Sequence, residues 1–163
     1  QRYGVEDKII LTLSNGLQNV PPELAQEIVL AGMGGELIFR VLTAVPWVKT
    51  GGCRLVLQPM SRAPELRKGL LKLGFEVLEE KALEDGSRVY SAFSARYIGN
   101  ISSTGRLFPY MGKILPGTEA AEKYAKKVLS GMLGQLNGLS HKGKLEEASQ
   151  LQEVAEEIKR IYL

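Results

Sequence analysis

The chain has 163 residues, which suffices for one domain of ordinary size with an appendage but not for two full α/β domains. Apolar residues make up 44% and charged residues 24%, so disorder or a fibre is excluded for the chain as a whole. The net charge is only +3, no apolar run approaches the length of a membrane span, and a single cysteine rules out an internal disulfide and a cysteine-based zinc site.

The single cysteine, Cys53, and the first residue bear on where the protein works and how the chain begins. An unpaired cysteine is typical of a reducing compartment, so we expect a cytoplasmic protein. Gln1 stands where a complete reading frame would begin with Met, and no signal-peptide pattern follows it. We therefore expect further sequence upstream of this residue.

The first predicted elements are two strands separated by a turn. Residues 8–13 are rich in β-branched and aliphatic side chains and end at Ser14-Asn15-Gly16, so they are predicted to form a strand. Pro21-Pro22 opens a short helical turn. Residues 28–31 then form a second, buried strand, which ends abruptly at the glycines of residues 32–35.

Helices and strands continue to alternate up to residue 97. Apolar residues at helical spacing predict a helix over 37–45, and a strand follows over 54–57. A second helix is predicted over 63–73, where proline occupies a plausible first helical position. Residues 75–83 and 88–97 flank an Asp-Gly step and form a hairpin. This order predicts a doubly wound α/β domain, with a parallel sheet and an antiparallel edge, over residues 1–97.

The remainder of the chain is predicted to be a linker and a helical hairpin. Residues 98–117 contain glycines, serines and prolines without clear periodicity, so we assign them to the linker. Apolar side chains then recur at three and four residues, with an interruption over 137–143. We predict that residues 118–163 form an antiparallel, coiled-coil-like pair of helices.

Charge is distributed unevenly along the chain. Residues 98–144 carry seven Lys or Arg against two Glu, whereas residues 145–163 carry five Glu against two basic residues. Such a pattern is typical of a footprint for a polyanion, but two helices that neutralise each other would have it too. Charge alone slightly favours the second interpretation.

The glycine-rich turn over residues 31–35 is the strongest local signal. Ligands of doubly wound sheets bind beyond the carboxyl ends of the strands, and this turn follows a predicted strand directly. Three glycines in four residues permit a close approach of another molecule, and equally a tight turn that serves only helix packing. Neither the dinucleotide pattern nor the P-loop pattern is present, so an enzyme that uses a nucleoside triphosphate or a dinucleotide is disfavoured.

A family resemblance adds a specific hypothesis to these patterns. The strings NGL, AGMGGELI, RLVLQPMSRAPELRKGLLKLGFEVLEEKALEDGSRVYSA and FPYMGKIL, in this order, resemble the TrmK family of bacterial tRNA (adenine-N1)-methyltransferases, which methylate adenine 22. The resemblance implies a class I, Rossmann-like methyltransferase sheet followed by a C-terminal coiled-coil hairpin. It also implies S-adenosylmethionine as cofactor and tRNA as partner, with no metal and no membrane; the oligomeric state stays open.

The resemblance assigns a cofactor and target-base site to the strand ends. It places the cofactor beside Asn15, Gly16, Leu17, Ala31, Gly32 and Met33. It places the reacting atoms beside Ala31, Gly32, Met33, Gly34, Gln58 and Pro59. Many relatives have Asp at the position of Asn15 and an amide at that of Met60, so this pocket is less polar here. Because N1 of adenine already carries a lone pair, the site needs in-line placement of the base more than a strong general base.

The expected RNA contacts are basic side chains near this site and on the first hairpin helix. They are Arg62, Arg67, Lys123, Lys126 and Lys127, and the alternative for each lysine is an ordinary solvated position. Adenine N1 takes part in base pairing, so the target base must be extruded. His141 is expected to be a solvated turn residue, and the aromatic side chains of the linker are expected to pack in the core.

Two strands of the family's sheet have no counterpart in this sequence. The family order is 3-2-1-4-5-7-6, and residues 8–13 would be strand 3 while residues 28–31 would be strand 4. We therefore expect either a truncated chain or a rearranged sheet in which residues 8–13 pair with residues 28–31. In either case the chain is expected to bind S-adenosylmethionine weakly or not at all. The alternative function is a non-enzymatic RNA-binding or interaction module.

Overall fold

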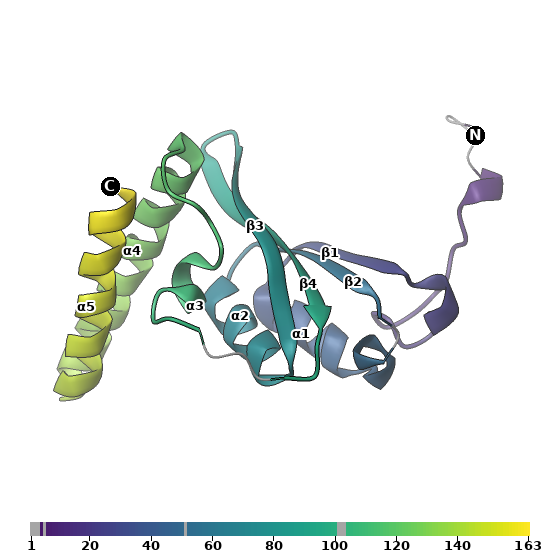
Figure 1. Cartoon of the computed structure of the whole chain (residues 1–163), viewed down its shortest axis with the longest axis horizontal. Coiled ribbons are helices and arrows are strands. Elements are labelled where there is room, and N and C mark those ends of the chain that lie inside the picture. The colour runs from purple at the N-terminus through teal and green to yellow at the C-terminus, as the bar shows by residue number, and fades with distance from the viewer. Residues whose placement is uncertain (1–3, 5, 51, 101–103) are drawn as a thin grey trace.

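A computed structural model describes residues 4, 6–50, 52–100 and 104–163 and shows a small sheet with helices on one side and a helical pair at one end (Figure 1). The strands are β1 (Glu27–Met33), β2 (Arg54–Pro59), β3 (Phe75–Asp85) and β4 (Arg88–Tyr97). The helices are α1 (Gly35–Thr43), α2 (Ala63–Lys72), α3 (Phe108–Met111), α4 (Glu119–His141) and α5 (Leu145–Tyr162), with short 3-10 turns at Glu6–Lys8, Pro22–Leu24 and Pro46–Lys49.

The sheet has the strand order β1-β2-β4-β3. β1 and β2 are parallel, whereas β4 is antiparallel to both of its neighbours. If β1 is taken as strand 4 of the expected family order, this is 4-5-7-6, so the second part of that order is confirmed. The Asp-Gly hairpin is confirmed as well, with Asp85 opposite Arg88 and Gly86 at a φ of 58°.

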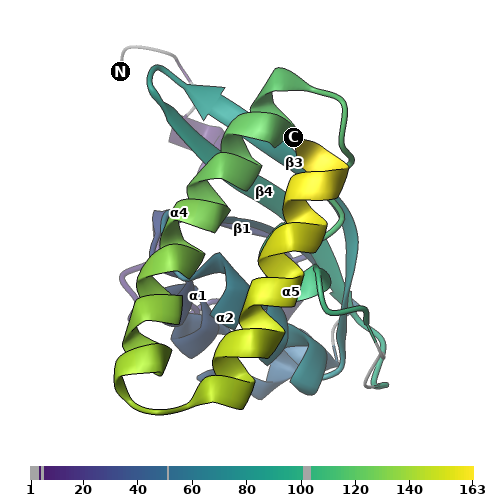
Figure 2. The same cartoon turned by 90° about the vertical axis from the view of Figure 1, so that its left-hand side faces the viewer.

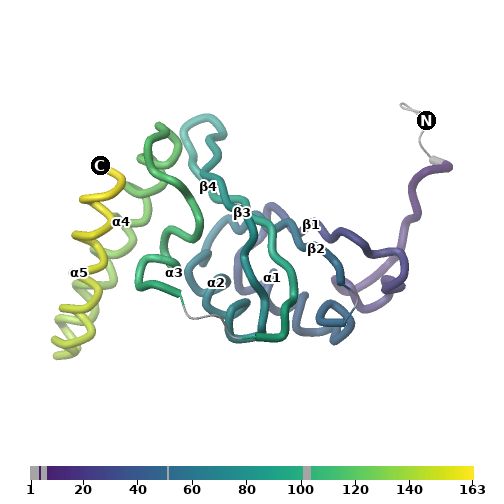
Figure 3. Tube along the Cα trace, in the orientation of Figure 1, coloured from purple at the N-terminus to yellow at the C-terminus, as the bar shows by residue number. Residues whose placement is uncertain are grey.

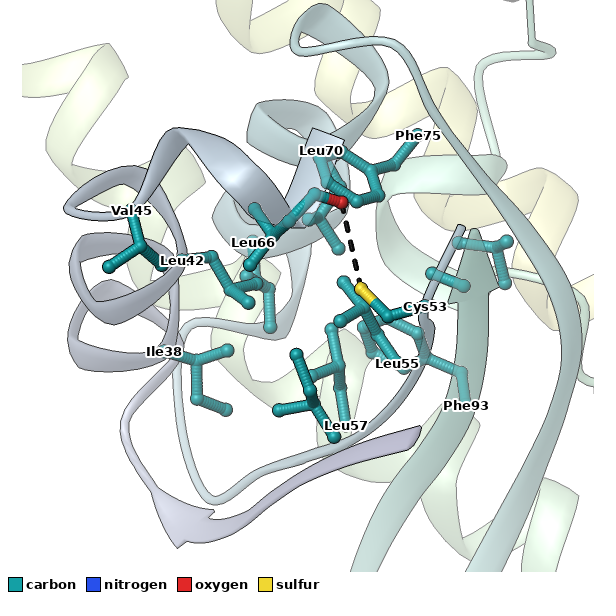
Figure 4. Packing of buried hydrophobic residues seen from close by; sticks show 14 of the residues in the cluster. Ile38, Leu42, Val45, Cys53, Leu55, Leu57, Leu66, Leu70, Phe75 and Phe93 are labelled. Carbon is teal, nitrogen blue, oxygen red and sulfur yellow. Dashed lines mark hydrogen bonds between the residues drawn. The ribbon is translucent and has the colours of Figure 1, made fainter. Parts of the chain in front are cut away.

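Helices α1 and α2 lie on the same face of the sheet and bury its main hydrophobic core (Figure 4). Ile38 and Leu42 of α1 and Leu66 and Leu70 of α2 pack against Leu55, Leu57, Phe75 and Phe93 from the strands. A doubly wound sheet, as predicted, has helices on both of its faces. In this structure α1 and α2 cover the same single face. The thiol of Cys53 lies in this core and donates to the carbonyl of Val48 at 3.7 Å.

The predicted strand over residues 8–13 is wrong. Lys8 ends a 3-10 turn, residues 9–13 are in neither a helix nor a strand, and Leu11 and Leu13 are 92% and 96% exposed. The trace runs away from the sheet at the end opposite α4 and α5 (Figure 3). A strand is stable only when its backbone groups are paired. β1 pairs with β2 alone among the described residues, so the rearranged sheet, one of the two alternatives, does not occur.

Helices α4 and α5 form the antiparallel pair that the apolar spacing predicts, and they lie side by side in Figure 2. The Thr118 hydroxyl caps α4 by accepting from the backbone N–H of Ala121 at 3.1 Å. The predicted interruption over residues 137–143 is confirmed at Lys142 and Gly143, which separate α4 from α5, but it begins later than predicted because α4 continues to His141. A second hydrophobic core lies between α3, α4 and α5 and contains Met111, Leu129, Met132, Leu151 and Ile158. Leu136 and Leu139 pack against this second core, which outweighs the weak helix preference of the Asn137-Gly138 step.

The predicted linker contains an ordered, packed segment. Within the described residues 104–117, α3 brings Met111 into the second core, and Ile114 follows it there. The expectation that the aromatic residues of this segment pack in the core is confirmed for Phe108 and Tyr110, which contact the first and second cores respectively. Residues 101–103 lie outside the described part of the chain. The division into domains at residues 97 and 118 stays a prediction.

Candidate functional site

The glycine-rich turn closes β1 with a bulge. Ala31 pairs with Gln58 and Met33 with Pro59, so Gly32 is the extra residue between two paired positions. Its φ of 76° lies in the left-handed region, which glycine adopts without strain. The bulge places the exposed backbone of Ala31 and Gly32 at the carboxyl end of the parallel pair, where the sequence predicts the site.

Three hydrogen bonds between this turn and residues 58–61, at and after the end of β2, hold the turn in place. The Gly32 N–H donates to Gln58 Oε1 at 2.8 Å, and the Met60 N–H donates to the carbonyl of Met33 at 2.9 Å. The Gly35 N–H donates to the carbonyl of Ser61 at 2.8 Å. The two predicted strand-end segments, residues 31–34 and 58–59, are therefore brought together as expected. Gln58 acts here as a brace on the backbone, and its amide Nε2 lies 3.8 Å from Met60 Sδ.

The glycines of the turn serve two different purposes. A Cβ on Gly35 would lie 2.6 Å from the carbonyl oxygen of Arg62, so this glycine is needed for close packing of the two loops. A Cβ on Gly32 would meet no heavy atom within 4 Å, so the space beside Gly32 is open. Since the Gly35 N–H already donates to Ser61 and Glu36 is the next residue, this turn is a poor phosphate cradle.

The Asn15-Gly16-Leu17 segment does not lie at this turn. Gly16 packs against Val41, with a Cβ position 3.0 Å from the Val41 side chain, and Leu17 contacts the main core. Val41 follows Gly35 by six residues along α1, which corresponds to about 9 Å of helix. That these residues share one cofactor site with residues 31–33 stays a prediction. With no paired strand to carry it, the segment docks on the nearest apolar surface.

Arg67 is not an RNA contact, because its side chain is fully buried. Its guanidinium pairs with Glu80 of β3, with Nη2 at 2.5 Å from Oε1, and donates to the Ser91 and Tyr124 hydroxyls at 3.0 Å. It also donates to the carbonyls of Pro109 and Tyr110 at 2.8 and 3.0 Å. The Arg67 network thus joins α2, the hairpin, α3 and α4, which the position of Arg67 in the sequence does not reveal.

Electrostatics keep this buried cation charged. Burial by itself lowers the pKa of Arg67, but the neighbouring Tyr124 and Glu80, through charge and hydrogen bonds, raise it above its ordinary value. The second Glu80 oxygen, Oε2, accepts from the backbone N–H of Lys113 at 3.1 Å. Both charges therefore have hydrogen-bonding partners, as buried ions require.

The three predicted lysines line one pocket, which we call the basic pocket. It lies between the β3–β4 turn and α4 and has a volume of about 690 Å³. Its lining residues are Met60, Glu84, Gly86, Ser87, Arg88, Val89, Tyr90, Lys123, Lys126 and Lys127. The sequence brings the lysines together by helical spacing, whereas Arg88 and Tyr90 join them only through the tertiary structure. A basic residue next to the Asp-Gly turn is the one signal that points to Arg88.

The lysines of the basic pocket differ in their surroundings. Lys123 forms ion pairs with Glu84 at 2.6 Å and Glu119 at 2.7 Å, and these partners raise its pKa. Lys127 donates to the carbonyl of Val89 at 2.6 Å and lies 4.9 Å from the centre of the Tyr90 ring. Burial lowers the pKa of Lys127.

Arg62 lies at the mouth of a second, smaller pocket. Its backbone has a φ of 56°, and its exposed side chain forms ion pairs with Glu65 at 3.4 Å and Glu36 at 3.8 Å. This pocket of about 220 Å³ lies between the loop after β2 and α4, and it shares Met60 and Lys127 with the basic pocket. Arg62 is therefore accessible, as expected, but its charge is partly balanced.

Two general properties of the described residues complete the picture. They contain no group of three or more His, Cys, Asp or Glu side chains arranged to hold a metal ion. No helix among them has the length and apolar character that a membrane crossing requires. His141 is exposed at the end of α4, in line with the expected solvated position.

Comparison with known proteins gives a consistent family assignment. A family model for a methyltransferase domain matches residues 1–93. The tRNA (adenine(22)-N(1))-methyltransferase of Bacillus subtilis is 31% identical over 121 residues, a match that covers 69% of this chain and 51% of that protein. The chain therefore spans about half the length of the curated relative that it matches.

Solved structures match the fold over most of the chain. One is the B. subtilis M1A22 tRNA methyltransferase TrmK, with a TM-score of 0.72 and 25% identity over 89% of this chain and 68% of that one. Another is a Streptococcus pneumoniae protein described as a tRNA (m1A22) methyltransferase, in complex with S-adenosyl-L-methionine. Its TM-score is 0.70, with 25% identity over 100% of this chain and 72% of that one.

Proposed function

This chain belongs to the methyltransferase-domain family and, within it, to the TrmK family, and we propose that the protein transfers a methyl group from S-adenosylmethionine to N1 of adenine 22 in tRNA. The glycine-rich turn carries the proposal, since its sequence is the most specific part of the resemblance. Its position beyond the carboxyl ends of β1 and β2 is the position at which such folds bind their ligands.

The turn suits a reaction that depends on placement. S-adenosylmethionine, when bound, supplies an electrophilic methyl group on a sulfonium sulfur. Ala31, Gly32 and Met33 would hold this end of the cofactor, because Ala31 and Gly32 are exposed and the space beside Gly32 is open. Gln58 and Pro59 would support this backbone from β2, because Gln58 accepts from the Gly32 N–H and the buried Pro59 pairs with Met33. Backbone groups that do not move are well suited to orienting a base whose N1 is already nucleophilic.

The described residues fit one wall of the cofactor site and do not complete it. Gly16 lies beside Val41 of α1, Leu17 packs on the main core, and no paired strand precedes them among the described residues. We therefore propose that this chain, as it stands, binds S-adenosylmethionine weakly or not at all. Calorimetric titration of the chain tests this statement, and a micromolar dissociation constant would contradict it.

We propose that tRNA binds at the basic pocket, which Lys123, Lys126 and Lys127 line, with Arg62 near the mouth of the site. Such side chains position RNA by its phosphates and do not select sequence. A cytoplasmic location would suit this substrate. Arg67 has no part in this contact because it is buried.

Deletion of the gene in its host tests the proposed reaction. The N1 methyl group on adenine 22 should disappear from tRNA, which primer extension detects because the modified base no longer pairs. A gene copy with Gly32→Val should fail to restore it, since valine is strained at a φ of 76° and fills the open space beside the turn. A copy with Gly134→Ala in α4, where a Cβ meets nothing, should restore it.

The basic pocket, together with a sheet that has no strand paired to β1 other than β2 among the described residues, favours a second function, RNA binding without methyl transfer by this chain. Unchanged adenine 22 methylation in the deletion strain would reject the methyltransferase function. Tight tRNA binding by the chain, unaffected by added S-adenosylmethionine, would then support the second function.

A further inference from the structure

The basic pocket has a strong excess of positive charge. Four cationic side chains line it, namely Arg88, Lys123, Lys126 and Lys127, and Glu84 is the one carboxylate among the lining residues that the structure describes. Two separate elements supply these groups, since Arg88 begins β4 just after the β3–β4 turn and the three lysines lie on α4. A concave surface lined by one sign of charge concentrates the field and attracts ligands of the opposite sign.

The four cations are not equivalent. Glu84 and Glu119 already neutralise Lys123, and the Lys127 ammonium is held by the Val89 carbonyl beside the Tyr90 ring. Arg88 and Lys126 are exposed, and within the described residues neither side chain forms an ion pair or a hydrogen bond. These two side chains are therefore the ones available to an external anion.

The pocket is held in shape by contacts on both of its sides. Tyr124 lies on α4 between Lys123 and Lys126 in the sequence, faces the core, and its hydroxyl accepts from Arg67 at 3.0 Å. The Lys123–Glu84 pair and the Lys127–Val89 hydrogen bond join α4 directly to the hairpin. Arg88 and Lys126 thus project from two elements that are fixed to each other, which reduces the entropic cost of binding.

The pocket is also connected to the glycine-rich turn. Met60 belongs to the lining of the pocket, and the backbone N–H of the same residue holds the Met33 carbonyl at the turn. Tyr90 and Met60 provide apolar surface beside the cations, which suits the sugars and bases between successive phosphates better than a compact anion.

We propose that the basic pocket binds the phosphodiester backbone of an RNA strand, with Arg88 and Lys126 as the contacting cations and Lys123 and Lys127 as residues that position α4 on the hairpin. This inference rests on the proposed function, in which the target base of the same RNA lies at the glycine-rich turn. It adds the β3–β4 turn to the RNA-binding surface and divides the lysines into contacting and positioning residues.

Binding of labelled tRNA to the chain, measured by fluorescence anisotropy over a range of salt concentrations without cofactor, tests the inference. The double variant R88Q/K126Q should lose about tenfold in affinity, and the slope of log affinity against log salt should fall by about 1 to 2. The matched control is R40Q/K72Q, which also removes one exposed Arg and one exposed Lys, from α1 and α2. It should bind like the wild type.

Each outcome decides the matter. Wild-type affinity and slope in R88Q/K126Q, equal losses in both double variants, or no binding of tRNA by the wild type would overturn the inference. Unlabelled tRNA should displace the labelled strand, and tripolyphosphate at matched ionic strength should not; efficient displacement by tripolyphosphate would indicate a site for free polyphosphate instead. Methylation of adenine 22 is measured separately, in the deletion strain. The reaction can therefore fail its test while the anisotropy experiment still confirms the RNA-binding pocket, and the two failures are told apart.

Discussion

The Arg67 network and the basic pocket use the same kinds of side chain for opposite purposes. In the network, one fully buried guanidinium has five hydrogen-bonding partner residues on four elements, so its charge holds the fold together. In the pocket, Arg88 and Lys126 are exposed and unpaired among the described residues, so their charge remains available to a ligand. Tyr124 links the two regions, because its hydroxyl accepts from Arg67 and it lies on α4, the helix that carries the lysines of the pocket.

The largest expected effect comes from removing the buried cation. Arg67→Met leaves Glu80 buried without its partner, so we expect the free energy of unfolding to fall by about 3–5 kcal/mol in urea denaturation. The control Arg106→Met removes exposed pairs to Glu153 and Glu157 and should cost at most about 1 kcal/mol. If the free energy of unfolding fell equally in the two variants, burial of the Arg67–Glu80 pair would not be the cause of its contribution to stability.

A smaller loss is expected when the network is disturbed from the backbone. Gly112→Ala should destabilise the protein by about 2–4 kcal/mol, because its Cβ would overlap Glu80 and its φ of 58° is left-handed. Gly117→Ala is the control, because Gly117 has a φ of 95° and no atom lies near its Cβ, so alanine there adds backbone strain without overlap. Its free energy of unfolding should fall by only about 1–2 kcal/mol. Chemical denaturation of both variants measures the difference, which reports the space that Glu80 needs. A larger loss in Gly117→Ala would contradict this account.

The smallest expected effect is a pH dependence at the edge of the basic pocket. Burial lowers the pKa of Lys127 below its ordinary value of 10.5, so the folded state releases this proton before the unfolded chain does. The burial penalty on charged Lys127 is therefore present at neutral pH and disappears as pH rises through the window below 10.5. The stability of the wild type minus that of Lys127→Met should rise with pH in that window. A difference that falls with pH would have the wrong sign.

Local patterns predicted much of the secondary structure correctly. Apolar spacing located α1, α2, α4 and α5, and the Asp-Gly step located the β3–β4 hairpin. These elements are decided by short-range preferences together with one apolar face, both of which are visible in sequence. The glycine-rich turn belongs to this group as well, since three glycines after a strand leave few alternatives for the backbone.

Residues 8–13 show where such patterns fail. Their side chains favour a strand as strongly as those of β1, yet only β1 has a partner with which to pair. Pairing is a long-range property, and so is the place where the following Asn15–Leu17 segment docks. For the same reason the sequence could not separate Arg67 from the accessible basic residues, since its partner Glu80 lies thirteen positions away on another element.

The sequence by itself determined the alternation of strands and helices, the helical pair, the glycine-rich turn and the family to which the chain belongs, because these depend on neighbouring residues or on specific strings. Only the tertiary structure decided which strands pair, that Arg67 is buried, and that Arg88 lies with Lys126 in the basic pocket. The physical reason is that pairing, burial and the sharing of a surface are properties of residues that the folded chain brings together from distant positions.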